Sequence, residues 1–177
     1  YVKFPYVSEK KVTLPAGVDP KQAFAVIWTT TPWTMPANVA ISVNPELEYG
    51  WVKVGEEYYL MATELVDAAM KDIGIEDYEI VNRFSGADLE LADFKHPFVE
   101  RNSTVLLGDH VTLDAGTGCV HTAPAHGEDD FNIVQRYNKE GKAELPIVSL
   151  VNETGNYTKQ VDDNRYGDTE FPLAGVE

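Results

Sequence analysis

Two short segments of this chain concentrate the side chains that could bind a ligand or transfer a proton. The first, WTTTPWTMPANVAISVNPE, covers residues 28–46, and the second, GTGCVHTAPAHGEDDF, covers residues 116–131. The first combines three threonines with a tryptophan and an asparagine, and in the second a histidine stands nine residues before an aspartate. The candidate site residues are Thr29, Thr30, Thr31, Trp33, Asn38, His121 and Asp130.

The threonines come at the end of a hydrophobic run over residues 24–29. If the chain is extended there, Thr29 and Thr31 face one side and Thr30 faces the other, so one face presents hydroxyl groups. Threonine is also a good strand former, and a bare run of three is by itself more often a strand than a site. The residues that follow favour a site.

Pro32 and Pro36 forbid regular ladder pairing, which predicts an exposed, stiff loop over residues 31–36. Such a loop would display Trp33, which could stack on a base or close one wall of a pocket. Asn38 follows where the next strand begins. Its amide could contact a ligand or could only support the start of the strand.

The second segment supplies the groups that titrate. The Gly-Thr-Gly sequence at residues 116–118 permits a close backbone approach, and His121 follows on a short strand. His121 could be a general base, a steric wall or a core histidine. Glu128 and Asp129 suit the first turn of a helix whatever their function. Asp130 could equally accept hydrogen bonds from the ammonium group of a ligand.

Several other chemistries lack their residue patterns. The chain has no HExxH motif, and a single cysteine with scattered histidines does not suggest a zinc site, so we expect no metal in this domain. Cys119 lies two residues before His121, but it sits among small apolar residues and makes a poor nucleophile. Residues 116–118 lack the further glycine of a phosphate-binding loop.

Composition limits the range of partners. The 177 residues carry a formal net charge of −15, which argues against broad nucleic-acid binding unless other domains contact the phosphate backbone. We find no apolar run long enough to span a membrane and no signal peptide. The lone cysteine fits a reducing compartment. The chain begins with Tyr1 rather than methionine, from which we expect a piece of a longer protein.

The patterning predicts many short strands and few helices. Strands are expected over residues 1–7, 24–29, 39–43, 49–54, 58–62, 79–84, 89–94, 104–107, 119–122 and 147–150. Helices are expected over residues 63–73, with Thr63 as N-cap and Gly74 as terminator, and over residues 129–137, with Phe131, Val134 and Tyr137 on the apolar face. Turns or loops are expected over residues 14–19, 44–46, 55–57 and 152–155, with only weak structure signals over 157–177. The sum is one α+β domain over residues 1–177, a strand-rich, barrel-like sheet with two or three peripheral helices.

The two motif segments closely resemble the editing insertion, connective peptide 1, of bacterial-type isoleucyl-tRNA synthetases. YVKFPYV at the start, HPF at residues 96–98 and LPIVSLVNETGNYT resemble the same family, so the resemblance spans nearly the whole chain. The related valyl and leucyl enzymes carry an arginine where Thr31 stands and an acid where Trp33 stands. These two positions favour the isoleucyl branch.

The resemblance implies a hydrolase that clears mischarged Val-tRNA(Ile) and supports the clearance of valyl-adenylate. Valine and isoleucine differ by one methylene. In a single apolar pocket this difference gives only about 1–3 kcal/mol of binding discrimination, a value for which this enzyme family is itself the standard example. A second site that admits valine and excludes isoleucine would multiply the discrimination. Water would attack the aminoacyl ester, positioned by the site and assisted by oxyanion stabilisation.

The resemblance also assigns roles to the candidate residues. The threonines would line the pocket and contact the terminal adenosine and the aminoacyl group, with Trp33 beside them and Asn38 as the editing asparagine. His121 would limit the size of the amino-acid side chain, and general-base chemistry is its less favoured role. Asp130 would bind the ammonium group of the substrate. Cys119 and Ala125 depart from the commonest residues of the family, but neither touches these contacts.

The implied context is a larger, cytoplasmic and monomeric enzyme. No HIGH-like or KMSKS-like motif is present, so amino-acid activation with ATP and Mg would belong to other domains, as would any zinc. The expected partners are the 3′ end of tRNA(Ile) carrying valine and the remaining synthetase domains, with no membrane and no cofactor in this domain. Two alternatives stay open: an editing domain of the valyl or leucyl type, and a module that, when isolated, binds the aminoacylated 3′ end without hydrolysing it.

Overall fold

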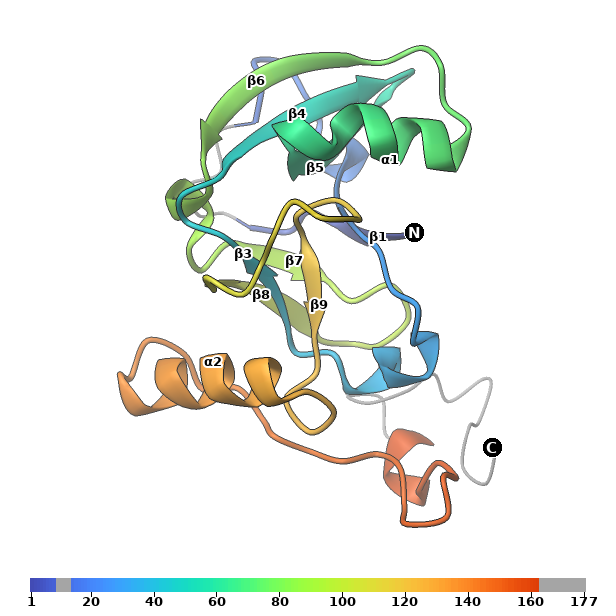
Figure 1. Ribbon diagram of the computed structural model, residues 1–177, viewed down its shortest axis with the longest axis vertical. Helices are drawn as coiled ribbons and strands as arrows, with labels where there is room; N and C mark the ends of the chain where they lie inside the picture. The colour runs from blue at the N-terminus through green and yellow to red at the C-terminus, as the bar shows by residue number, and fades with distance from the viewer. Residues whose placement is uncertain (9–13, 163–177) are drawn as a thin grey trace.

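Two sheets stacked face to face form the framework of the molecule (Figure 1). The computed structural model describes residues 1–8 and 14–162. The first sheet has the order β1-β2-β5-β4-β6, with strands β1 (Val2–Pro5), β2 (Ala23–Ile27), β4 (Glu48–Val54), β5 (Glu57–Ala62) and β6 (Glu79–Ser85). The second has the order β7-β8-β3-β9, with strands β3 (Ala40–Val43), β7 (Asp93–Lys95), β8 (Asn102–Leu107) and β9 (Val120–Thr122).

The main core lies between the two sheets. Tyr49 and Trp51 of β4 and Phe4 of β1 are fully buried, and they share one apolar cluster with Ile41 of β3 and Phe94 of β7. β2 and β5 are parallel, as are β3 and β8, whereas β3 and β9 are antiparallel. The pairing of β3 with β9 therefore places the end of the first motif segment (residues 28–46) beside the second motif segment (residues 116–131).

Two α-helices cover the outside of this framework in the described part of the chain (Figure 1). Helix α1 (Val66–Ile73) packs on the first sheet through Val66, Ala69 and Met70, and it ends at Gly74 in the left-handed conformation, as the sequence predicts. Helix α2 (Glu128–Lys139) packs beside β8 and β3. The α+β class with peripheral helices is confirmed, although the two sheets do not close into a barrel.

Most of the expected strands are present. The hairpin of β4 and β5 turns at Gly55, and β6, β8 and β9 lie within two residues of their expected bounds. The second helix is also confirmed, but its buried face differs from the expected one. Ile133 lies on that face with Val134 and Tyr137, while Phe131 is 36% exposed. A spacing of three residues follows the buried side of a helix less closely than alternate steps of three and four.

The expected exposed loop over residues 31–36 is wrong. A 3₁₀ helix, η2 (Pro32–Ala37), occupies this stretch, and Thr34 and Met35 are buried. Pro32 stands at its first position, where the missing N–H is not needed. β2 ends at Ile27, so the three threonines lie in the connection to η2 and not in a strand.

The strand expected over residues 89–94 is mostly wrong. A 3₁₀ turn, η4 (Gly86–Leu89), occupies its beginning, and β7 starts only at Asp93. Ser85 and Asp88 form a capping box that starts this turn. The Ser85 hydroxyl accepts the Ala87 backbone N–H, and the Asp88 carboxylate accepts the Ser85 backbone N–H. Local capping therefore prevails over strand propensity at this point.

Two further expectations are wrong. In one case a partner strand is missing, and in the other a competing hydrogen bond is formed. Residues 147–150 form no strand, since Ile147 is 41% exposed and the nearby pairing is one isolated bridge between Val151 and Tyr157. Thr63 is not an N-cap: its hydroxyl donates to Glu48, and a 3₁₀ turn, η3 (Thr63–Leu65), precedes α1. The remaining short elements are η1 (Pro20–Gln22) and η5 (Lys159–Asp162), and the expectation for residues 163–177 falls outside the described residues.

Candidate functional site

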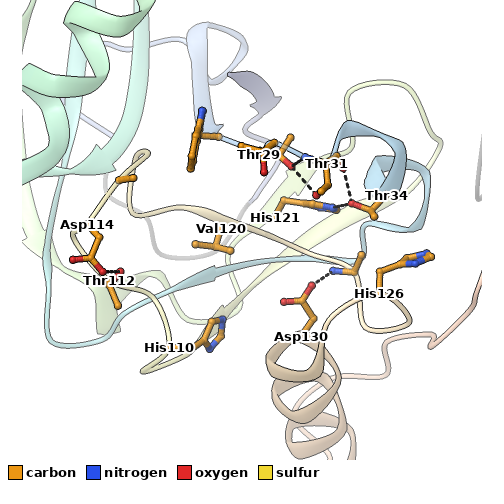
Figure 2. A pocket seen from close by; sticks show the side chains of 14 residues that line it. Thr29, Thr31, Thr34, His110, Thr112, Asp114, Val120, His121, His126 and Asp130 are labelled. Carbon is orange, nitrogen blue, oxygen red and sulfur yellow. Dashed lines mark hydrogen bonds between the residues drawn. The ribbon is translucent and has the colours of Figure 1, made fainter.

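The two motif segments meet at one cleft of about 410 Å³ (Figure 2). Thr29, Thr30 and Thr31 border it from the connection between β2 and η2, His121 from β9, and Asp130 from the first turn of α2. Figure 2 shows Thr29 and Thr31 on one side and Asp130 on the other, with His121 and Val120 between them. The volume suits a small organic ligand. Further lining residues are Trp28, Thr34, His110, Thr112, Asp114, Ala115, Val120, Ala123 and His126.

The threonine segment is folded on itself by its own side chains. The Thr29 hydroxyl accepts the Thr31 backbone N–H at 3.0 Å, and the hydroxyl oxygens of Thr29 and Thr31 lie 3.4 Å apart. These two hydroxyls therefore face each other, although the backbone is not the extended strand that the alternation assumed. Thr30 and Thr31 are exposed at the cleft, so their hydroxyls are available to a ligand.

Asn38 lies behind the cleft wall and does not line the cleft. Its amide is fully buried, and Nδ2 donates to the Ala40 carbonyl oxygen at 2.8 Å. Because a carbonyl can only accept, this contact fixes which end of the amide carries the hydrogens. The second hydrogen of Nδ2 then points to His121 Nδ1, also at 2.8 Å. His121 Nδ1 is therefore an acceptor.

The tautomer of His121 follows from this contact. With Nδ1 accepting, a neutral ring carries its hydrogen on Nε2, which lies 2.8 Å from the Thr34 hydroxyl oxygen. Thr34 in turn donates its hydroxyl hydrogen to the Thr31 carbonyl at 3.0 Å. Burial and the charge of His126 lower the pKa of His121 to about 4, so the ring is neutral near pH 7. Both ring nitrogens are engaged, which suits a fixed wall better than a general base.

Asp130 offers a carboxylate at the far side of the cleft. Its Oδ2 accepts the Ala123 backbone N–H at 2.8 Å, which ties the start of α2 to the end of β9. Within the described residues, Oδ1 has no hydrogen-bond partner. Burial raises the pKa of Asp130, while the Ala123 bond and the charge of His110 act in the opposite direction. The position at a helix N-terminus favours the ionised form.

Trp33 lies beside the cleft and not inside it. The residue is 49% exposed, and its ring packs edge to face against His126, with ring centroids 5.2 Å apart. His126 lines the cleft. The Trp33 carbonyl accepts the Tyr157 hydroxyl, which holds the tryptophan from outside. The exposed aromatic expected from the sequence is therefore present, on a 3₁₀ helix rather than on a loop.

Two cleft histidines have polar atoms that the protein itself does not use. Nε2 of His110 and Nε2 of His126 are buried and have no hydrogen-bond partner among the described residues. Buried polar atoms in native proteins are nearly always paired. His110 is held close to Gly108, where an added Cβ would lie 2.5 Å from the ring. A ligand or water in the cleft would supply the missing partners.

The candidate residues chosen from the sequence leave out several residues of this region. Trp28 and His110 line the cleft, Thr34 holds His121, and Ser103 holds Asn38. Trp28 and Thr34 belong to the first motif, so their positions could have suggested a role. Ser103 gave no usable signal, because a single serine in a strand is commonplace and its contact with Asn38 comes from a distant segment.

Over residues 1–8 and 14–162, no group of three or more His, Cys, Asp or Glu side chains is placed to hold a metal ion. In the same residues, no helix is long and apolar enough to cross a membrane.

Comparison with known families identifies the fold and the site region together. The family model described as the editing domain of leucyl-tRNA synthetase matches residues 27–170, which include both motif segments. The chain belongs to this family of synthetase editing domains. The sequence-based resemblance to a synthetase editing domain is thereby confirmed.

Curated relatives of this editing domain are isoleucine–tRNA ligases. The enzyme of Caldicellulosiruptor saccharolyticus is 46% identical over 160 residues, and that of Brevibacillus brevis is 50% identical over 161 residues. Both alignments cover 90% of this chain. The chain spans only 16–17% of the length of these relatives. They support the isoleucyl branch that Thr31 and Trp33 favoured.

Solved structures confirm the fold of the editing domain. The crystal structure of GlLeuRS-CP1 has a TM-score of 0.60 at 23% identity, covering 72% of this chain and 49% of that one. The editing domain of the cytosolic leucyl-tRNA synthetase of P. knowlesi has a TM-score of 0.60 at 14% identity, covering 68% and 52%. The fold of two packed sheets is therefore that of a synthetase editing domain.

Proposed function

We propose that this editing domain hydrolyses the ester bond of Val-tRNA(Ile) and supports the clearance of valyl-adenylate. The observation that carries the proposal is the arrangement around one cleft of three threonines, a neutral buried histidine and a carboxylate. These groups can contact, respectively, the hydroxyl-rich 3′ terminus, the apolar side chain and the ammonium group of an aminoacyl ester. The similarity to isoleucine–tRNA ligases is the reason that we propose valine as the amino acid to be removed.

The proposed reaction uses water as its only co-reactant. Water adds to the ester carbonyl, and the bond from that carbon to the ribose oxygen breaks. One proton of the water restores the ribose hydroxyl, and the other passes to solvent as valine leaves as a carboxylate. Such an ester is intrinsically labile, so holding the reacting groups in position supplies much of the acceleration. Hydroxyl and backbone N–H groups of the threonine segment are suited to stabilise the oxyanion.

The proposed role of Asp130 is to bind the ammonium group of valine. Its Oδ1 is unoccupied by the described residues, and an ionised carboxylate forms strong, charge-assisted hydrogen bonds. His121 would form the wall that admits valine and excludes the additional methylene of isoleucine. Trp33 and His126 would lie along the path of the terminal adenosine.

We place this domain within a longer, cytoplasmic isoleucyl-tRNA synthetase that acts as a monomer. The partners in this proposal are the 3′ end of tRNA(Ile) and the remaining synthetase domains. ATP with Mg and any zinc would serve those other domains, and the reaction proposed here requires no cofactor. The net charge of −15 suits a domain that holds only the 3′ terminus while other parts bind the phosphate backbone.

A matched pair of variants tests this function. Asp130→Asn keeps an oxygen that can accept the Ala123 N–H but removes the charge, and Asp129→Asn makes the same change one residue away on the exposed side of α2. We expect Asp130→Asn to reduce Val-tRNA(Ile) hydrolysis at least about tenfold, as the loss of a charged hydrogen bond would. Asp129→Asn should stay near the wild-type rate. Equal rates in all three proteins would contradict the ammonium site, and retained binding of Val-tRNA without hydrolysis in the wild type would indicate a binding module.

A further inference from the structure

Two buried hydroxyl groups support the site without a part in the proposed reaction. Thr34 of η2 is 6% exposed, and Ser103 of β8 is fully buried. β8 contributes none of the residues that line the cleft. Each hydroxyl nevertheless contacts a residue of the site, Thr34 at His121 and Ser103 at Asn38. The two groups belong to one series of hydrogen bonds, which runs from Ser103 to the Thr31 carbonyl.

The direction of this series of hydrogen bonds is fixed along its length. Ser103 donates to Asn38 Oδ1, because an amide oxygen can only accept. Asn38 Nδ2 donates to His121 Nδ1, His121 Nε2 donates to the Thr34 hydroxyl, and Thr34 donates to the Thr31 carbonyl. Reversing any one bond would set two donors or two acceptors against each other. The series therefore allows one protonation state and one orientation of the imidazole.

We propose that Thr34 and Ser103 are positioning residues that set the tautomer and the orientation of His121, and thereby the size limit of the cleft. This inference rests on the proposed function in one respect, the role of His121 as the wall against isoleucine. The state of the ring itself does not depend on that role and can be measured separately.

The contribution of Thr34 is the acceptor for the Nε2–H group. His121 is 9% exposed, so water has little access to replace a lost acceptor. A buried N–H without a partner is unfavourable, and the ring would turn about its Cβ–Cγ bond to find another acceptor. The Thr34 hydroxyl also donates to the Thr31 carbonyl, so the same change would remove one of the two hydrogen bonds that this carbonyl accepts, the other coming from the Thr34 backbone N–H.

The contribution of Ser103 is to hold the amide of Asn38. Ser103 and the Ala40 carbonyl bind opposite ends of this amide, which together keep Nδ2 toward His121. Without the serine hydroxyl, Asn38 Oδ1 is a buried acceptor that has lost its donor. The Ala40 carbonyl alone would then hold the amide in this orientation. An amide that turns over would lose the Ala40 bond, present its oxygen to His121 Nδ1 and favour the opposite tautomer.

The test combines four substitutions with two readouts, measured on the whole polypeptide of 177 residues. Thr34→Val and Ser103→Ala each remove one hydroxyl group from the series of hydrogen bonds. Ser42→Ala is the matched control. Ser42 is fully buried in the neighbouring strand β3, and its hydroxyl is hydrogen-bonded to Thr122, which takes no part in this series of hydrogen bonds. The readouts are the ring ¹⁵N and ¹H resonances of His121, which report the tautomer, and the ratio of Val-tRNA(Ile) to Ile-tRNA(Ile) hydrolysis.

The wild type should show one His121 tautomer, with hydrogen on Nε2. Thr34→Val and Ser103→Ala should each shift or broaden the His121 ring resonances and lower the Val-to-Ile ratio about tenfold, the effect of one buried hydrogen bond. Ser42→Ala should leave both readouts at their wild-type values, and Thr34→Ser, which keeps the hydroxyl, should restore them. If either Thr34→Val or Ser103→Ala unfolds, the other variant, compared with Thr34→Ser and the wild type, decides the outcome.

The proposal is overturned if the ring resonances and the ratio stay unchanged in both variants, or if Ser42→Ala alters them equally. It is also overturned if wild-type His121 carries its hydrogen on Nδ1. If the wild type hydrolyses neither ester, the proposed function fails, whereas the resonances still decide whether Thr34 and Ser103 set the state of the ring.

Discussion

At the scale of single residues, the site consists of side chains that face the cleft and of buried side chains that hold them in place. Thr29–Thr31, His121 and Asp130 meet at one cleft, as the two motifs suggested. Asn38 does not line that cleft. Its buried amide is hydrogen-bonded to Ala40, Ser103 and His121. Contacts of this kind join segments far apart in the chain, and no local pattern records them.

The size limit attributed to His121 can be tested by shortening it. We expect His121→Ala to admit the additional methylene of isoleucine, and the Val-to-Ile ratio of hydrolysis should fall at least about fourfold, the value of one buried methylene. Rates on both aminoacyl-tRNAs provide the measurement, and a thermal unfolding curve shows whether the variant is folded. If a folded variant still spares isoleucine, another residue sets the limit.

At the scale of elements, strands with clear alternation were predictable and segments governed by local capping or by missing partners were not. The hairpin of β4 and β5 has an unambiguous turn at Gly55. Residues 31–36 look like a loop because of two prolines, yet they form η2. His96 and Arg101, from the β7–β8 connection, donate to the Met35 and Pro36 carbonyls of that helix. Those donors arrive only in the folded protein.

The glycine before β9 provides a prediction about an element. Gly118 has a φ of +75°, and an added Cβ would lie 2.5 Å from the Ala62 Cβ, whereas Gly141 has a φ of +67° and open space around it. We expect Gly141→Ala to lower the free energy of unfolding by about 1–2 kcal/mol through backbone strain alone. Gly118→Ala should lose roughly 2–5 kcal/mol, because overpacking adds to the strain. Denaturant titrations of both variants measure the difference, and equal losses would mean that β9 can shift away from β5.

At the scale of the whole molecule, the fold class was predictable because short alternating strands dominate the sequence. The division into two sheets was not, since β2 with β5 and β3 with β8 are parallel pairs between distant segments. The boundary of a single domain at residues 1–177 stays a prediction. The packing of both sheets around one core encloses two histidines, His96 and His121, as neutral rings.

These histidines predict how stability responds to acid. Burial lowers the pKa of His96 to about 3 and that of His121 to about 4, both below the ordinary 6.5. The unfolded chain therefore binds more protons than the folded one below pH 6.5, and stability falls as the pH decreases from 6.5 toward 4. Each histidine contributes at most about 1.4 kcal/mol per pH unit. The raised pKa of Asp130 acts in the opposite direction.

Unfolding free energies at pH 7, 6 and 5 check this prediction before most carboxylates begin to titrate. Glu48 and Glu57, whose pKa values are lowered by hydrogen bonds to Arg83 and Lys3, add their own loss only below about pH 4.5. A stability that stays constant from pH 7 to pH 5 would mean that the two histidines are more accessible than their burial indicates.

The measurement that tests the central claim most directly is hydrolysis of Val-tRNA(Ile) and Ile-tRNA(Ile) by this chain under identical conditions. The cleft predicts release of valine with isoleucine largely spared, because the ammonium contact at Asp130 serves both esters while the wall at His121 admits only the smaller side chain. The same assay in the longer synthetase shows whether other domains must present the tRNA. Hydrolysis of both esters at equal rates, in the chain and in the longer enzyme, would contradict the account.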